Sequence, residues 1–303
     1  LWKKTISIRE AAMADKLDID SHTGVETTGH EWDGIKELNT PLPRWWLWLF
    51  YACILWAVGY WIFFPAWPMV SDYTRGVLGY SQRATVMANI DQARASQAGL
   101  NNTIEKASLA EIKSKPELLN FALAGGKAAF ANNCSPCHGR GAQGFPGYPN
   151  LNDDKWLWGG TLDQIQQTIM YGVRSGNDKA HVSQMPKFGE DKLLTPEQIN
   201  DTAEYVLSLS KLPHDAAAAE RGKAVFHGDG GCMACHGEEG KGNQDVGAPG
   251  LTDNIWLYGG TKDAIKHQIE TGHGGVMPAW VDRLDPATIK KLAIYVHSLG
   301  GGQ

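Results

Sequence analysis

The sequence of 303 residues is 43% hydrophobic and 20% charged, which excludes disorder throughout and allows about two domains of ordinary size. Its 28 basic and 33 acidic residues give a net charge of −5. Binding to nucleic acid by phosphate neutralisation needs a surplus of positive charge, so nucleic acid is not an expected partner. Five cysteines are too few for a disulfide scaffold in a chain of this length.

A run of twenty residues without a charge, 45–64, is the first predicted element. As a helix that rises about 1.5 Å per residue it spans about 30 Å, the thickness of one bilayer core. Tryptophans cluster near both ends, as aromatic rings do at lipid–water interfaces. A buried core helix is seldom apolar on every face over this length, and a cleaved signal peptide lies at the N-terminus with a shorter apolar core. The run predicts an uncleaved transmembrane helix.

Residues 65–115 are mixed and polar, with helix-compatible stretches such as 81–98, and predict a helical spacer that ends near Pro116. Beyond it the chain repeats itself, and we expect one domain over 116–213 and another over 214–303. The matching segments are 126–130 with 222–226, 134–138 with 232–236, 156–161 with 256–261, 185–186 with 277–278, and 205–209 with 295–299. Two copies indicate a tandem duplication, because a solenoid needs three or more units.

Each copy is predicted to consist mainly of short α-helices. Thr161 with Gln164 and Thr195 with Gln198 fit capping boxes at helix starts. Between the predicted helices lie loops rich in glycine and proline, without the alternating pattern of strands. Copies of this size have small cores, so an internal prosthetic group would help to stabilise them.

Both copies contain Cys-x-x-Cys-His, the attachment pattern of c-type haem. The two thiols are spaced to form thioether bonds to the two haem vinyl groups, and the adjacent histidine is then directed at the iron as proximal ligand. These residues are Cys134, Cys137 and His138 in the first copy and Cys232, Cys235 and His236 in the second. The pattern predicts two covalently bound haem c groups.

Two other uses of paired cysteines are less consistent with the sequence. A structural zinc site needs further ligands at metal-site spacing, and no such pair recurs. A thiol oxidoreductase places its Cys-x-x-Cys motif near a βαβ pattern, which the sequence lacks. The recurrence of the whole motif inside a wider repeat favours haem.

An electron-transfer haem needs a sixth iron ligand, and a thioether there raises the reduction potential. Met185 and Met277 are the candidates, because each follows its Cys-His motif at a similar distance and is followed by proline. His181 and His273 lie four residues before these methionines, so bis-histidine ligation is the rival hypothesis. Pairing of ligands within each copy is the default, but an exchange between the copies stays open.

The features together resemble the CcoP family, also called FixP, the dihaem subunit III of cbb3-type cytochrome c oxidases. The resemblance runs from about Gly24 and is most specific in 28–35 and 41–46, Thr-Gly-His-Glu-Trp-Asp-Gly-Ile and Pro-Leu-Pro-Arg-Trp-Trp. It implies a mainly α fold, with one N-terminal transmembrane helix followed by two tandem class I cytochrome c domains. It also implies four axial ligands, which are His138, Met185, His236 and Met277.

The resemblance further implies assembly with a catalytic subunit I and a monohaem subunit II, and a role without bond chemistry of its own. The chain would accept electrons from a cytochrome c and pass them to the oxidase core. Because haem c is attached on the outer face of the bacterial inner membrane, we expect residues 65–303 to be periplasmic and 1–44 cytoplasmic. Residues 1–12 depart from the family pattern and are interpreted as a non-native extension before a start at Met13.

Two alternative functions stay open at this point. One is a free-standing, membrane-anchored dihaem cytochrome that carries electrons between respiratory complexes. The other is a haem-based gas or redox sensor, which requires a vacant or displaceable sixth position at the iron. The repeated Met-Pro motifs argue against the sensor.

Overall fold

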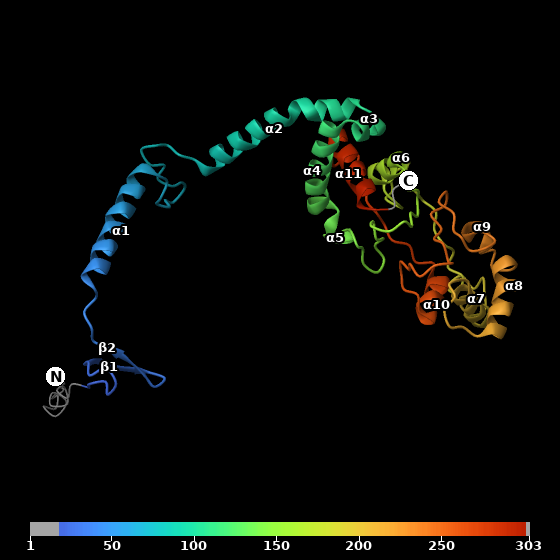
Figure 1. Ribbon diagram of the computed structural model, residues 1–303, viewed down its shortest axis with the longest axis horizontal. Helices are drawn as coiled ribbons and strands as arrows, with labels where there is room; N and C mark the ends of the chain where they lie inside the picture. Colours follow the sequence, from blue (N-terminus) through green and yellow to red (C-terminus); the bar gives the residue numbers. More distant parts are fainter. Residues whose placement is uncertain (1–17, 301–303) are drawn as a thin grey trace, which may run out of the picture. The chain divides into compact units, whose positions relative to one another are not determined.

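The computed structural model describes residues 18–300, so the expectation about residues 1–12 falls outside the described chain (Figure 1). The described chain forms two units, one that ends at Asp91 and one that begins at Gln92. The fold is mainly α-helical, as expected.

In the first unit, strands β1 (Thr27–Trp32) and β2 (Ile35–Leu38) form an antiparallel hairpin. The two turn residues, Asp33 and Gly34, both have positive φ angles, of 49° and 86°. An Asp-Gly pair between two strands favours this kind of turn, because both positions tolerate a left-handed backbone. We did not predict this hairpin, although the Asp-Gly pair was a usable signal.

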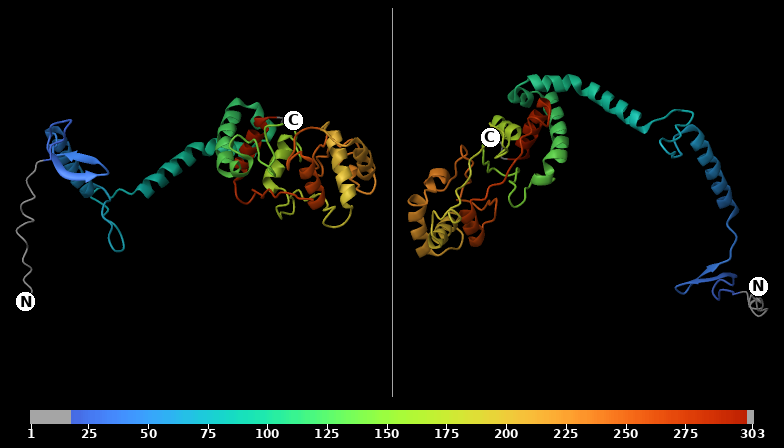
Figure 2. Two further views of the ribbon diagram at one scale, coloured as in Figure 1. Left: turned by 90° about the horizontal axis from the view of Figure 1, so that it is seen from below. Right: turned by 180° about the vertical axis from the view of Figure 1, so that it is seen from behind.

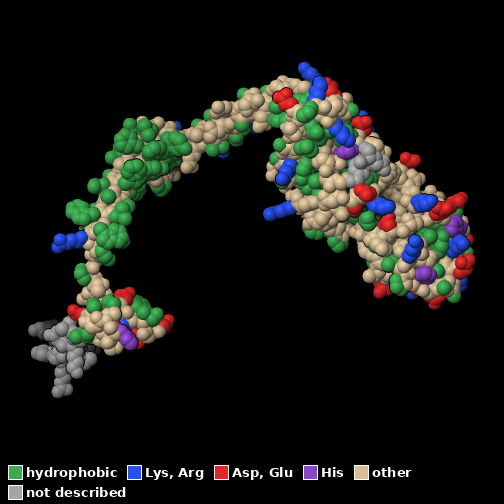
Figure 3. Space-filling view, viewed as in Figure 1, with side chains coloured by type: hydrophobic (Ala, Val, Ile, Leu, Met, Phe, Trp, Pro, Cys, Tyr) green, Lys and Arg blue, Asp and Glu red, His purple; other side chains and the backbone are tan. Residues whose placement is uncertain are grey.

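Helix α1 (Arg44–Phe63) confirms the predicted apolar helix. It begins after Pro43, because proline is tolerated just before a helix start, and it ends at Phe63, two residues before Pro65, because proline does not continue a helix. None of its side chains is buried, and Trp48 and Trp56 are 74% and 78% exposed. Figure 3 shows hydrophobic side chains gathered over this helix. Within residues 18–300 it is the one helix long and apolar enough to cross a membrane.

Helix α2 (Gln82–Lys106) is longer than the predicted stretch 81–98. Its C-terminal end belongs to the second unit, where Ile104 is fully buried in the core. The Lys290 ammonium donates hydrogen bonds to the carbonyls of Glu105 and Ala107, at 2.8 and 2.6 Å. These carbonyls lie at a helix end, where they lack partners within the helix and attract a cation. Tertiary contacts from far along the chain therefore account for its extra length.

The second unit contains two hydrophobic cores, each assembled from both copies of the repeat. Figure 2 shows the final helix of the described chain, in red, beside the green helices of the first copy. The first core brings α3 (Leu109–Ser114), α4 (Pro116–Asn133) and α6 (Leu162–Tyr171) together with the last helix of the chain, α11 (Pro286–Leu299). The second brings α7 (Pro196–Leu209), which ends the first copy, together with α8 (Ala216–His227) and α10 (Lys262–Thr271). The two copies thus exchange their final helices.

The exchange depends on close helix crossings at two equivalent glycines. A side chain on Gly126 of α4 would lie 2.3 Å from the backbone oxygen of Lys291 in α11. A side chain on Gly222 of α8 would lie 1.9 Å from the backbone oxygen of Asp201 in α7. Such distances are far below van der Waals contact, so only glycine lets the backbones approach this closely.

An aromatic pair supports each crossing. Its phenylalanine lies four residues after the glycine on the same helix, and its tyrosine lies on the exchanged helix. Phe130 packs against Tyr295 with ring centroids 5.5 Å apart, and Phe226 packs against Tyr205 at 5.3 Å. Both phenylalanines are almost fully buried. Equal chemistry at the two crossings shows that the duplicated sequence builds the same helix pair twice.

The connecting segments also cross from one copy to the other. Val173 and Met277 exchange two backbone hydrogen bonds, each of 3.0 Å. On the other side, the Phe188 amide donates to the carbonyl of Ile269 at 3.2 Å. The copies are therefore joined by backbone pairing on both sides as well as by helix packing.

We expect Gly222→Ala to lower the free energy of unfolding by about 3 kcal/mol, because the added methyl group cannot be accommodated against a helix backbone. Urea unfolding of the detergent-solubilised chain, followed by far-ultraviolet circular dichroism, measures the change. Gly99→Ala in α2 is the matched control, since nothing lies within 4 Å of its added methyl group and alanine favours helix. Equal stability of the two variants would contradict the crossing.

Candidate haem sites

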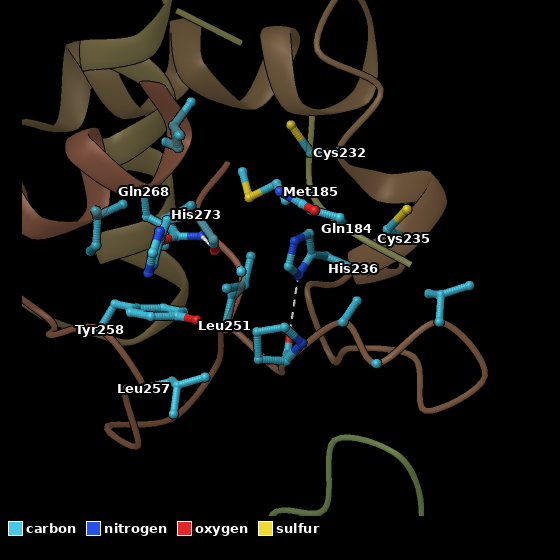
Figure 4. Close-up of a pocket in the computed structure, with 18 of the residues that line it drawn as sticks. Gln184, Met185, Cys232, Cys235, His236, Leu251, Leu257, Tyr258, Gln268 and His273 are labelled. Atoms are coloured by element: carbon cyan, nitrogen blue, oxygen red, sulfur yellow. Dashed lines mark hydrogen bonds between the residues drawn. The ribbon is translucent and has the colours of Figure 1, made fainter. Parts of the chain in front are cut away.

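A cavity of about 340 Å³ in the second unit is lined by residues of both copies. Figure 4 shows Met185 of the first copy and His236 of the second directed into this space, with Cys232 and Cys235 beside it. Most of the wall is apolar and comes from side chains such as Trp256. The structure thus brings one predicted methionine together with the complete Cys-x-x-Cys-His motif of the other copy.

Each Cys-x-x-Cys-His motif forms one short helical turn. In α9 (Met233–His236), the His236 amide donates to the Cys232 carbonyl at 2.9 Å. In α5 (Ser135–His138), the His138 amide donates to the Cys134 carbonyl at 2.9 Å. Each turn places its two cysteines three residues apart and its histidine directly after the second cysteine.

A backbone carbonyl orients each histidine. Nδ1 of His236 lies 2.9 Å from the carbonyl oxygen of Pro249, and Nδ1 of His138 lies 3.1 Å from that of Pro149. A carbonyl only accepts, so Nδ1 carries the proton and Nε2 keeps its lone pair for a metal. Burial lowers the pKa of both histidines, which favours the neutral form. Such an arrangement suits a metal ligand, whose other ring nitrogen is typically held by a carbonyl or carboxylate.

The sequence analysis did not identify the two prolines as partners of the histidines, although the repeat contained a signal for them. Pro149 and Pro249 each lie two residues before a repeated leucine, Leu151 and Leu251. That leucine donates its amide to the loop that follows the motif, and the proline carbonyl lies within hydrogen-bonding distance of the histidine Nδ1.

None of the five cysteines forms a disulfide. Burial raises the pKa of Cys134 and of Cys232 to about 11, so neither thiol is activated at neutral pH. A thiol oxidoreductase needs the opposite shift. Within residues 18–300, no group of three or more His, Cys, Asp and Glu side chains is placed to hold a metal ion, which leaves the zinc alternative without a ligand set.

Met277 of the second copy packs against the first core, as do Cys134 and Trp156 of the first copy. Its backbone oxygen is so close to Gly172 that a side chain there would approach to 2.2 Å. Gly272 has the same relation to the backbone oxygen of Met185, at 2.4 Å. Each methionine segment therefore lies across the end of a helix from the other copy.

The rival histidines have other partners. His181 stacks on Trp158 with ring centroids 4.2 Å apart, and its Nε2 lies 3.1 Å from the Thr168 hydroxyl. His273 lines the cavity but packs against Tyr258 at 5.3 Å, as Figure 4 shows. These contacts favour the methionines as candidate sixth ligands.

Comparisons with known proteins give matches over most of the chain. Residues 24–71 match the N-terminal domain of cytochrome oxidase-cbb3, FixP, and residues 121–206 and 217–296 match cytochrome c oxidase, cbb3-type, subunit III. Cytochrome c domains imply haem c as the prosthetic group.

Similar proteins are cbb3-type cytochrome c oxidase subunits. FixP of Azorhizobium caulinodans is 55% identical, over 94% of this chain and 96% of that protein. FixP of Bradyrhizobium diazoefficiens is 54% identical, and CcoP of Azospirillum brasilense is 49% identical, each over 96% of this chain and 100% of the relative.

We expect Gly272→Ala to displace the Met185 segment, because the new methyl group meets two backbone oxygens and the glycine has a φ of +54°. Trypsin cleavage after Lys187, measured by mass spectrometry, should become several-fold faster. Gly176→Ala is the control: it has a similarly unfavourable φ of +82° but open space around it. Equal cleavage rates in the two variants would show that the close approach does not hold the segment.

Proposed function

The chain belongs to the family of cbb3-type cytochrome c oxidase subunits III, the FixP and CcoP proteins, and from that premise we propose that it carries two haem c groups with exchanged methionine ligands. It would accept electrons from a cytochrome c and pass them to the oxidase core, without bond chemistry of its own. The observation that carries this proposal is the convergence of Met185 with His236 and two thiols in one apolar cavity.

The residues present fit a haem at both motifs. The paired thiols on one helical turn would form the thioether links, and each carbonyl-bonded histidine offers a free Nε2 to the iron. Apolar walls such as Trp256 exclude water from the ring faces. When bound, haem supplies a one-electron couple at its iron.

We assign the four ligands in exchanged pairs. His236 of the second copy pairs with Met185 of the first, because they share one cavity. His138 of the first copy pairs with Met277 of the second, because Met277 packs against the same core as Cys134 of the His138 motif. A thioether ligand favours ferrous iron and so raises the potential, as suits an electron acceptor close to an oxidase.

The pairing can be tested in a variant that retains only the second attachment site, with Cys134→Ser and Cys137→Ser. On that background we expect Met185→Leu to abolish the near-infrared Met–iron band and to lower the haem potential in a redox titration. Met277→Leu is the matched control and should leave both readouts unchanged.

The opposite result, loss of the band only with Met277→Leu, would show pairing within each copy. No Met–iron band in the parent variant would favour bis-histidine ligation by His181 or His273, and the potential would then be low.

We propose a bacterial inner-membrane location, with α1 as the anchor, residues 18–43 on the cytoplasmic side and the haem-binding unit in the periplasm. The apolar surface of α1, none of which is buried, supports the anchor. Subunit I, a monohaem subunit II and a cytochrome c donor are the proposed partners. The net charge of −5 suits a donor with a basic face, by attraction that weakens with salt.

The orientation predicts which part of the chain a protease reaches in spheroplasts. Proteinase K added from outside should degrade residues 92–300, whereas the N-terminal hairpin should survive until the membrane is lysed. Antibodies against the two ends of the chain report both outcomes on one blot. Protection of the haem-binding unit before lysis would reverse the proposed orientation.

A further inference from the structure

Arg174 lies just after α6 and joins segments of both copies. Its Nε donates to the backbone carbonyl of Gly275 at 2.8 Å, and one terminal nitrogen donates to that of Ser183 at 2.5 Å. Ser183 is two residues before Met185, and Gly275 is two residues before Met277. One guanidinium therefore holds the two methionine segments together.

The backbone at Arg174 indicates that this position is constrained. Its φ is +50°, in the left-handed region that residues other than glycine rarely adopt. The guanidinium packs against Gly274, where an added methyl group would lie 3.1 Å from Nε. The surrounding structure thus compels a conformation that the residue alone disfavours.

The position has no equivalent in the other copy. Arg174 lies two residues after Gly172, and the residue two after Gly272 is Gly274. The half-buried side chain of Arg174 also lines the cavity that contains Met185 and His236. A planar guanidinium presents several donors in a fixed fork, so it can bind two carbonyls at once where a single ammonium has no such geometry.

We propose that Arg174 is a positioning residue that holds both methionine segments in place at the same time, so that one side chain sets the stability of methionine ligation at both haems. The proposal rests on the exchanged ligation by Met185 and Met277 described above. It predicts that removal of the guanidinium weakens methionine ligation at both haems, although Arg174 belongs to one copy only.

Imidazole titration of the oxidised, haem-loaded full chain in detergent tests the proposal, because imidazole replaces methionine only when the methionine segment opens. The loss of the Met–iron band is followed in Met277→Leu and Met185→Leu backgrounds, each of which retains one methionine-ligated haem. We expect Arg174→Gln to lower the imidazole concentration needed by about tenfold at each haem, as the loss of a hydrogen bond to a charged group predicts.

Two further variants distinguish the effect of the guanidinium's hydrogen-bond geometry from that of its positive charge. Arg174→Lys keeps the positive charge but not the planar guanidinium that binds two carbonyls. We expect imidazole to displace the methionine at a lower concentration than in the parent chain, at one haem or both. Lys179→Gln removes an exposed positive charge nearby and should leave the titrations unchanged. Thermal unfolding of each variant shows that it is folded at the temperature of the titration.

The proposal is overturned if Arg174→Gln changes neither haem or only one, or if Arg174→Lys behaves as the parent at both. Failure of the ligand assignment has a different signature: the single-methionine parents would then lack the Met–iron band before any change at Arg174.

Discussion

The close approach of helix backbones at Gly126 and Gly222 is the constraint on which the haem-binding unit depends. Each glycine admits the final helix of the other copy, and the aromatic pairs Phe130–Tyr295 and Phe226–Tyr205 fix these crossings. Once the helices are exchanged, the methionine segments that precede them must also cross between the copies. The composition of each candidate haem site therefore follows from helix packing some distance away from it.

Local features of the fold were predictable from the sequence. The apolar run before Phe64 encodes its helix by length and composition, and the Cys-x-x-Cys-His motifs determine a helical turn within five residues. The capping boxes at Thr161 and Thr195 are both present in the structure. These elements depend on interactions between near neighbours in the chain, which a single sequence records directly.

The exchange between the copies was left open because the duplication makes both pairings chemically alike. A helix with glycine and phenylalanine four residues apart accepts a tyrosine-bearing helix of either copy, so the sequence pattern cannot distinguish them. The role of Arg174 was missed for a related reason: its partners are backbone carbonyls, at residues 183 and 275, which leave no trace in the pattern of side chains. The hairpin at 27–38 is a different case, because its Asp-Gly turn was recognisable in the sequence but was not used to predict it.

The exchanged helices also have a consequence for biosynthesis. The first haem-binding core includes α11, which is made after all the other helices of both copies, so this core stays incomplete until the second copy has emerged. A nascent chain that carries only the first copy exposes the apolar face of α4 and lacks Met277. Covalent attachment at Cys134 and Cys137 would keep the prosthetic group in place during this interval, when packing alone cannot retain it.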